Sequence, residues 1–281
     1  MHEADVRRAV AATRAIASSL DLMVDDVALL NVSNKLALRL LPDDVMARVA
    51  LETDHVAAFE LELAQRLAAC GSPVARLDPR VAPRVYERDG FAVTLWTYYG
   101  PASARGTSSA DYANALARLH ADMRRLDIAA PHFTERVDSA LLLLASRDRT
   151  PELADRDRET LVRTLRRTAS TITERRAPEQ LLHGEPHPGN LLLTTEGPLF
   201  IDLETCCRGP IEFDLAHAPD DVVDQYAGVD RELLRACQML VLAMITTWRW
   251  DRDDRLPDGR QLGADWLAKL QAMLAHDGID G

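Results

Sequence analysis

The pattern of apolar positions predicts one helix followed by several strands in the first hundred residues. Residues 3–19 have apolar side chains at helical spacing. Short apolar runs at 27–30, 36–40, 45–50, 85–86 and 91–96 predict strands, and the last two flank the tight-turn pair Asp89-Gly90. A second helix is predicted over 54–70, ending at Gly71. Its expected buried stripe consists of Val56, Phe59, Leu63 and Leu67.

From Ser109 onward the apolar spacing is mainly helical. Helices are predicted from 109 to about 123 and from 134 to 145. A third is predicted to start at Thr150-Pro151, a cap residue followed by a proline suited to a first turn, and to end near residue 175. A further helix is predicted from Arg231 onward. Strands first and helices later indicate an α+β fold.

One hairpin interrupts the helical part, in the stretch LLHGEPHPGNLLLTTEGPLFIDLE at 181–204. Two apolar runs, 191–194 and 199–201, flank the turn residues 195–198. If the chain folds back about Glu196 and Gly197, Asn190 lies opposite Asp202, and Glu185 is just upstream. An amide and a carboxylate that converge, with a second acid near, are what a magnesium-bound phosphate requires.

These residues carry a resemblance to a known family. An acid, four residues, an Asn and a hairpin ending in Ile-Asp resemble the catalytic loop and metal-binding Asp of protein kinases. The segments HGEPHPGN, IDLE and GPIEFDLA resemble more closely the aminoglycoside phosphotransferase (APH) and choline kinase branch, whose motif is His-Gly-Asp-x-His-x-x-Asn. This chain departs from that motif because Glu185 replaces the Asp.

The resemblance extends from about residue 20 to the C-terminus and implies a bilobal, protein-kinase-like fold. A small, mostly antiparallel β lobe with one main helix is expected over 1–99, for the nucleotide. A larger helical lobe over 100–281 is expected to carry the catalytic hairpin and the acceptor site.

The resemblance also implies roles for individual residues. Glu185 would orient or deprotonate the acceptor hydroxyl, and Asn190 and Asp202 would hold Mg²⁺. Arg48 stands where the family has a Lys, or in some branches an Arg, against the nucleotide phosphates. Glu60 aligns with the helix glutamate that pairs with this cation. Taken singly, each is better explained as a solvated surface residue, but together with the hairpin the ion pair is favoured.

Other expected nucleotide contacts have weaker support. The loop that would cover the phosphates has no glycine, so its contacts would come from Ser33, Asn34 and the backbone, and an ordinary hairpin turn explains it equally well. Trp96 and Tyr98 lie at the expected hinge between the lobes, whose backbone would bind the adenine edge. Ordinary core and surface aromatic residues are the alternative for both.

Four residues are expected to support the catalytic loop. His183 and His187 are interpreted as hydrogen-bonding scaffold, Glu204 as a neighbour of the metal site, and Asp214 as a buried acid that caps backbone around the loop. A remote alternative is a metallohydrolase using His183, Glu185 and His187. The helical zincin arrangement is unsuited to this stretch, because Pro186 and Pro188 forbid a regular helix.

The net charge, the apolar runs and the cysteines limit the classes of partner and the cellular location that we expect. The net charge of −11 over 281 residues argues against nucleic acid. Apolar runs are too short for a membrane span, and no signal peptide is evident at the N-terminus. Four cysteines without a CxxC pair fit reduced thiols, so we expect a cytoplasmic protein. The sequence does not predict an oligomeric state.

The sequence therefore predicts an ATP- and Mg²⁺-dependent kinase that phosphorylates a hydroxyl of a small molecule. The acidic C-terminal third gives a faint indication of a cationic acceptor such as an aminoglycoside. The main alternative is a catalytically weak nucleotide-binding pseudo-phosphotransferase. It is favoured by the glycine-free loop, Arg48 and Glu185, and disfavoured by the presence of Asn190 and Asp202.

Overall fold

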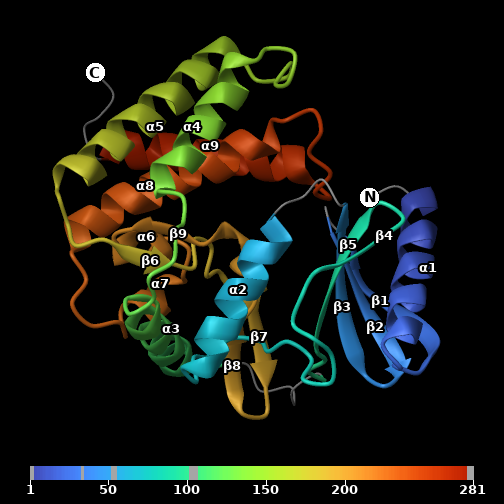
Figure 1. The fold of residues 1–281 in the computed structure, drawn as a ribbon. Helices are drawn as coiled ribbons and strands as arrows, with labels where there is room; N and C mark the ends of the chain where they lie inside the picture. Colours follow the sequence, from blue (N-terminus) through green and yellow to red (C-terminus); the bar gives the residue numbers. More distant parts are fainter. Residues whose placement is uncertain (1–2, 33–34, 52–55, 101–106, 277–281) are drawn as a thin grey trace. The chain divides into compact units, whose positions relative to one another are not determined.

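The computed structural model describes residues 3–32, 35–51, 56–100 and 107–276 (Figure 1). The chain forms two compact units, which are described separately. The first unit comprises residues 1–126 and 189–205, and the second comprises 127–188 and 206–281. The boundary between functional lobes near residue 99 stays a prediction.

The first unit is built on a five-stranded antiparallel sheet with the order β1-β2-β3-β5-β4. The sequence predicted all of these strands, although β1 is longer than expected. Helix α1, predicted over 3–19, has those bounds and lies against the sheet (Figure 1). The bounds are α1 Glu3–Ser19, β1 Val24–Val32, β2 Leu36–Pro42, β3 Val45–Leu51, β4 Tyr86–Arg88 and β5 Phe91–Thr97.

The alternation of side chains gives this sheet an apolar face and a polar face. Alternate residues of β3 are buried, starting with Val45 and Ala47, and they pack with β2, β5 and α1 in one core. The residues between them, Met46 and Arg48, point to the opposite face. Cross-strand pairing places Ala37 and Thr94 on either side of Arg48. The polar face is therefore the one that can carry a site.

Two helices and the short hairpin complete the first unit. They are α2 Val56–Ala69, α3 Ser109–Met123, β7 Leu191–Thr194 and β8 Gly197–Phe200. The predicted stripe of α2 is partly wrong. Leu63 and Leu67 are buried, whereas Val56 and Phe59 are only half-buried and Glu60 is buried in their place. A carboxylate replaces an apolar group there because Glu60 has a cationic partner on β3.

The register of the β7–β8 hairpin differs from the prediction by one residue. Thr194 pairs with Gly197, so Thr195 and Glu196 form the loop, and Ile201 donates its N–H to the Asn190 carbonyl oxygen at 3.0 Å. A loop at Glu196 and Gly197 would require a backbone N–H from Pro198 at the closing pair, and proline has none. Gly197, with φ of 116°, closes the turn instead. Asn190 is therefore opposite Ile201, not Asp202.

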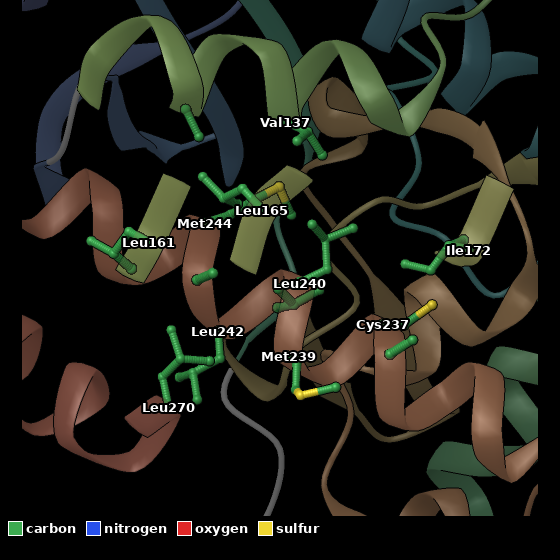
Figure 2. Close-up of a cluster of buried hydrophobic side chains, with 14 of the residues drawn as sticks. Val137, Leu161, Leu165, Ile172, Cys237, Met239, Leu240, Leu242, Met244 and Leu270 are labelled. Carbon is green, nitrogen blue, oxygen red and sulfur yellow. The ribbon is translucent and has the colours of Figure 1, made fainter. Parts of the chain in front are cut away.

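The second unit is mainly helical, with a two-stranded sheet of β6 and β9. Its core is formed by apolar side chains of α4, α5, α8 and α9 (Figure 2). Within the described residues, no helix is long and apolar enough to cross a membrane. The bounds are α4 Phe133–Ala145, α5 Asp155–Glu174, β6 Gln180–Leu182, β9 Cys207–Gly209, α6 Ile211–Leu215, α7 Asp220–Val223, α8 Arg231–Arg249 and α9 Gly259–His276.

Helix α5 begins later than predicted, with Ala154 as its N-cap in place of Thr150. The Thr150 side chain is fully buried, donates to the Ser146 carbonyl oxygen at 2.9 Å and accepts from Arg158 at 2.6 Å. Its hydroxyl is thus used in a tertiary contact, which the cap pattern could not anticipate. The expected apolar stripe of this helix, Leu161, Leu165 and Ile172, is buried.

Candidate active site

Two largely buried cations lie on the polar face of the first unit's sheet. Arg48 is on β3, and Lys35 immediately precedes β2 on the same face as Ala37, the cross-strand partner of Arg48. Both side chains are largely buried, with 11% of Lys35 and 17% of Arg48 exposed. Desolvated cations require acidic partners, and three acids supply them.

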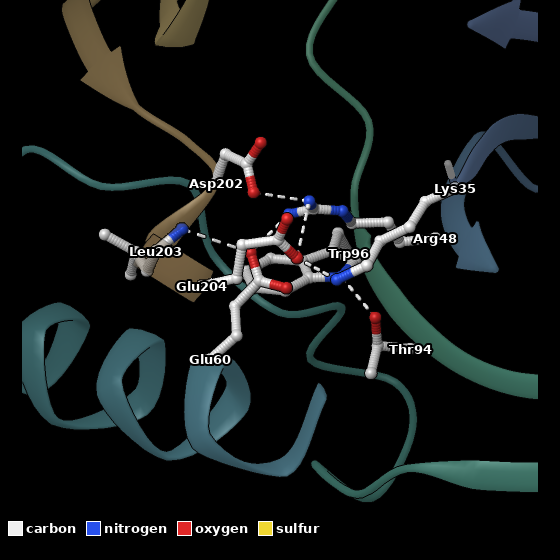
Figure 3. Close-up of polar contacts among 8 residues, drawn as sticks. All are labelled: Lys35, Arg48, Glu60, Thr94, Trp96, Asp202, Leu203 and Glu204. Carbon is white, nitrogen blue, oxygen red and sulfur yellow. Dashed lines mark hydrogen bonds and ion pairs between the residues drawn. The ribbon is translucent and has the colours of Figure 1, made fainter. Parts of the chain in front are cut away.

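These acids come from α2 and from the segment after β8 (Figure 3). Arg48 Nη1 pairs with Glu60 Oε1, and Arg48 Nη2 lies 2.5 Å from Asp202 Oδ1 and 3.5 Å from Glu204 Oε2. Lys35 Nζ pairs with Glu204 Oε2. We call these five residues the acid–cation cluster. The ion pair between Arg48 and Glu60 that the sequence predicted is present.

Glu60 holds the cluster to the backbone after β8. Its Oε1 also accepts the Leu203 N–H at 3.2 Å, and only 3% of its side chain is exposed. Burial raises the pKa of Glu60 above its ordinary value, and the opposing charge of Arg48 offsets this only in part. The cluster has three carboxylates and two cations, so one negative charge is not balanced. The neighbouring negative charge of Asp202 also raises the pKa of Glu60.

Asp202 and Glu204 are the accessible members of the cluster, with 31% and 25% of their side chains exposed. Asp202 has a φ of 67°, a left-handed conformation that aspartate tolerates better than most residues. Glu204 lies on the short 3₁₀ helix η2, Leu203–Thr205. The tight backbone turn brings two carboxylates that are two residues apart to the same arginine.

Three members of the cluster, Lys35, Arg48 and Asp202, line a cavity of about 270 Å³ in the first unit. The hairpin contributes Asn190 and Asp202 to its wall, and the end of β5 contributes Thr97 and Tyr98. The Tyr98 ring also stacks on the Arg39 guanidinium, whose carbon is 4.1 Å from the ring centroid. The residues predicted to meet at one site, Arg48, Tyr98, Asn190 and Asp202, therefore share one cavity.

Two other predictions for the nucleotide site have different outcomes. Trp96 does not line this cavity. Its side chain is 4% exposed and donates to Thr94 Oγ1 at 2.8 Å, behind Arg48 and Glu60. Ser33 and Asn34 lie outside the described residues.

The predicted catalytic acid, Glu185, belongs to the second unit. It lies in a loop whose backbone is held by Asp214, which is fully buried. The Asp214 carboxylate accepts the N–H groups of His183 and Gly184, both at 2.8 Å. Gly184 has a φ of 89°, which a side chain would disfavour. These are the contacts expected of an acid that caps the loop.

Arg136 of α4 fixes the Glu185 side chain. It pairs with Glu185 Oε1 through Nη2 and donates to the Gly184 carbonyl oxygen through Nη1 at 3.1 Å. Its guanidinium carbon lies 5.1 Å from the centroid of the Trp248 ring. Burial acts to raise the pKa of Glu185, but the positive charge of Arg136 and the hydrogen bond that it donates outweigh burial and lower this pKa. Glu185 is therefore ionised at neutral pH.

His217 is a further titratable group near this loop. Its Nε2 is buried and has no hydrogen-bond partner among the described residues. Burial lowers its pKa to about 4, and the charge of Glu185 opposes the shift. The imidazole is thus neutral at pH 7. His183 is also buried, and its Nδ1 accepts the Glu185 N–H at 3.3 Å.

The donor set suits a hard divalent cation better than zinc. Among the described residues, no group of three or more His, Cys, Asp and Glu side chains could hold a metal ion. This gives no support to the metallohydrolase alternative. The carboxylate of Asp202 and the amide oxygen of Asn190, in one cavity, fit Mg²⁺, which takes one or two carboxylates and completes its shell with phosphates and water.

Sequence reasoning missed Lys35 and Arg136. Each is a single cation without a motif around it, and its acidic partner is distant in the chain, by 169 residues for Lys35 and 49 for Arg136. One signal was available for Lys35. The chain has 33 lysines and arginines, of which only two, Lys35 and Lys269, are lysines.

Comparisons with known proteins give a family and a fold. The sequence model of the phosphotransferase enzyme family (APH) matches residues 45–250. No curated protein matches the chain significantly.

Solved structures similar to this chain share its fold at low sequence identity. They include the amicoumacin kinase hAmiN with AMP-PNP, Ca²⁺ and Ami, at TM-score 0.74 and 10% identity over 96% of both chains. The choline kinase LicA from Streptococcus pneumoniae has TM-score 0.67 and 16% identity over 94% of this chain and 99% of its own. The GDP and kanamycin complex of APH(2")-IIia has TM-score 0.65 and 15% identity over 96% and 99%. The α+β, kinase-like fold predicted from the sequence is thereby confirmed.

Proposed function

The chain belongs to the phosphotransferase enzyme family (APH), and we propose that it is a small-molecule kinase that transfers the γ-phosphate of ATP to a hydroxyl group. The observation that carries this proposal is one cavity lined by the cations Lys35 and Arg48 and by the oxygen ligands Asn190 and Asp202. Cations for phosphate oxygens and oxygen ligands for a metal are the parts that phosphoryl transfer needs.

In this proposal the nucleotide lies in the cavity of the first unit. The adenine would be bound by backbone groups near Tyr98, at the end of β5, and the phosphates would face the cluster. The Thr97 N–H already donates to the Arg76 carbonyl oxygen at 2.9 Å, so adenine contacts would come from its neighbours. Arg48 would keep α2 and the Asp202 segment in register with the sheet.

Asn190 and Asp202 would hold Mg²⁺, which when bound neutralises negative charge on the phosphates. Because Asp202 Oδ1 accepts a hydrogen bond from Arg48, metal binding would draw on the carboxylate's remaining lone pairs or displace that contact.

Glu185 would receive and orient the acceptor hydroxyl. Its lowered pKa keeps the carboxylate ionised, so that it accepts a hydrogen bond from the hydroxyl at neutral pH. The same low basicity favours orientation of the acceptor over early proton removal. Arg136 would hold the longer glutamate side chain in one position, which the family's aspartate achieves with a shorter stem.

The acceptor is a small molecule with a hydroxyl group, and cationic acceptors deserve priority in a search. Similar structures include a choline kinase and a kanamycin complex, and choline and kanamycin are both cations. The net charge of −11 is compatible with such a ligand.

The test is an unbiased acceptor screen. Purified protein is incubated with Mg²⁺ and ATP, or GTP in a parallel arm, and a panel of aminoglycosides, amino alcohols and neutral alcohols. Mass spectrometry then looks for a gain of one phosphate on the acceptor and matching ADP or GDP, with Asp202→Asn protein as the matched control. Nucleotide binding in a thermal-shift assay without turnover on any acceptor would favour the pseudo-phosphotransferase alternative. Absence of nucleotide binding would contradict both.

A further inference from the structure

Lys35 is an unusual residue in this chain because arginine supplies nearly every other positive charge. Only Lys35 and Lys269 are lysines, and they lie in very different surroundings. Lys269 is exposed on α9. Lys35 is 11% exposed, pairs with Glu204 and lines the same cavity as Arg48, Asn190 and Asp202. It also precedes residues 45–250, which the family model matches.

The two cations of the cluster are held differently. The Arg48 guanidinium contacts all three acids, and one of them, Glu60, is buried and bound to the backbone as well. A planar fork fixed by several carboxylates is well suited to joining structural elements. Lys35 pairs with Glu204, an acid with a quarter of its side chain exposed. Its ammonium is a compact charge on a flexible stem, so it can exchange one oxygen partner for another with little rearrangement.

We propose that Lys35 is a phosphate-binding residue of the nucleotide site and that the nucleotide phosphates replace Glu204 as its partner. Arg48 then acts mainly as the clamp between β3, α2 and the Asp202 segment. This inference rests on the proposed kinase function, since it assigns the phosphates of that nucleotide to Lys35. The driving force is electrostatic, because a triphosphate offers the ammonium more negative charge than a single carboxylate.

The presence of only two lysines makes a chemical test selective. The probe is an acyl-phosphate derivative of ATP, in which an acyl group forms a mixed anhydride with the γ-phosphate. The ε-amine of a lysine near the phosphates attacks the acyl carbon, an amide N–C bond forms, the anhydride C–O bond breaks, and ATP leaves while the amine proton goes to solvent. Peptide mass spectrometry of the full chain then reports labelling of Lys35 and Lys269 separately.

We expect Lys35 to be labelled and to be protected by excess ATP, whereas any labelling of Lys269 is insensitive to ATP. A thermal-shift measurement with Mg²⁺ and ATP on the same unlabelled protein separates the two hypotheses. If the protein binds ATP and Lys35 is not labelled in an ATP-protected manner, this inference is overturned. If it binds no nucleotide, the proposed function fails first.

The ATP affinity of Lys35 variants gives an independent test of this proposal. Lys35→Met should weaken ATP binding by about 10- to 100-fold, the usual loss for one charge-assisted hydrogen bond, and leave adenosine binding unchanged. Lys35→Arg should recover part of the affinity, and Lys269→Met is the matched control, with no change expected. Wild-type affinity for ATP in Lys35→Met would overturn the proposal. If Lys35→Met does not fold, the labelling experiment on the wild-type protein decides alone.

Discussion

The two units hold their candidate acids in different ways. In the first unit, Asp202 and Glu204 are a quarter to a third exposed and are held by side-chain cations, and Asp202 lies at the wall of a cavity. In the second, Asp214 is fully buried and binds two backbone N–H groups. The resulting loop presents Glu185, which is held by Arg136.

This difference separates ligand binding from loop stability. Ion pairs between partly exposed side chains can be exchanged for contacts with a nucleotide or a metal. Hydrogen bonds from buried backbone groups have no such alternative, because an unpaired buried N–H is costly. Substitutions of the partly exposed acids Asp202 and Glu204 should therefore change turnover and affinity, and substitutions behind the loop should change folding stability.

Asp202→Asn is expected to have the largest effect. It removes the charge that would hold Mg²⁺ against the phosphates, and metal stabilisation of the transition state contributes several kcal/mol, or about 1,000-fold or more in rate. Steady-state kinetics with the acceptor found in the screen measure the loss, and circular dichroism checks that folding is retained. Wild-type rates in a folded Asp202→Asn protein would remove Asp202 from the site.

Substitution of Glu185 should cause the second-largest loss of activity. Misplacement of a positioned group costs on the order of 100-fold, so Glu185→Gln should be nearly inactive and Glu185→Asp clearly impaired if Arg136 holds the longer side chain in its working position. The three proteins are compared in kcat with the same acceptor. A gain of activity in Glu185→Asp would instead indicate a degenerate site restored to the usual reach, and equal rates for Glu185→Gln and wild type would leave this carboxylate without a role.

Asp214→Asn tests the other side of the comparison. The amide keeps one acceptor oxygen but loses the charge and the second backbone contact, so the free energy of unfolding should fall by about 3 kcal/mol. Urea denaturation measures this, with the exposed Asp253→Asn as the control, for which we expect a change within about 0.5 kcal/mol. Unchanged stability in Asp214→Asn would show that the loop is held by other contacts.

The smallest expected effect is a pH dependence from His217. Its pKa is about 4 in the folded protein and about 6.5 in the unfolded chain, so the unfolded state binds more protons between these values. The free energy of unfolding should therefore fall as the pH decreases from 6.5 to 4. The expected loss is about 2 kcal/mol, less than the full pKa difference implies, because the side chain is partly exposed and solvent screens its charge.

His217→Asn should lose less stability than the wild type over that range, because the substituted side chain does not titrate. Urea denaturation at several pH values measures the slope, and the exposed His276→Asn should keep the wild-type slope. Identical slopes in the wild type and His217→Asn would show that the imidazole is not kept neutral by burial.

The sequence by itself determined most of the secondary structure and the residues of the hairpin motif. Local patterns sufficed for α1, for the strands of the sheet and for α3, since side-chain period and caps act within a few residues. The motif 183–202 and its resemblance to a phosphotransferase family also follow from local spacing, and the family is now shown.

Only the tertiary structure decided which charges meet. Lys35 and Glu204, like Arg136 and Glu185, are distant in the chain, and no local pattern couples them. The burial of Glu60 is of the same kind, because a carboxylate on an apolar helix face is stable only when a cation from another element reaches it.

The register of the β7–β8 hairpin lies between these two cases, because it depends on a local residue but was not predicted correctly. The one-residue difference in the β7–β8 hairpin follows from Pro198, which has no N–H to close a loop at Glu196 and Gly197. The sequence thus determines what depends on neighbouring residues. The long-range ion pairs that shape the cavity depend on how the sheet, α2 and the hairpin pack, and only the folded chain specifies them.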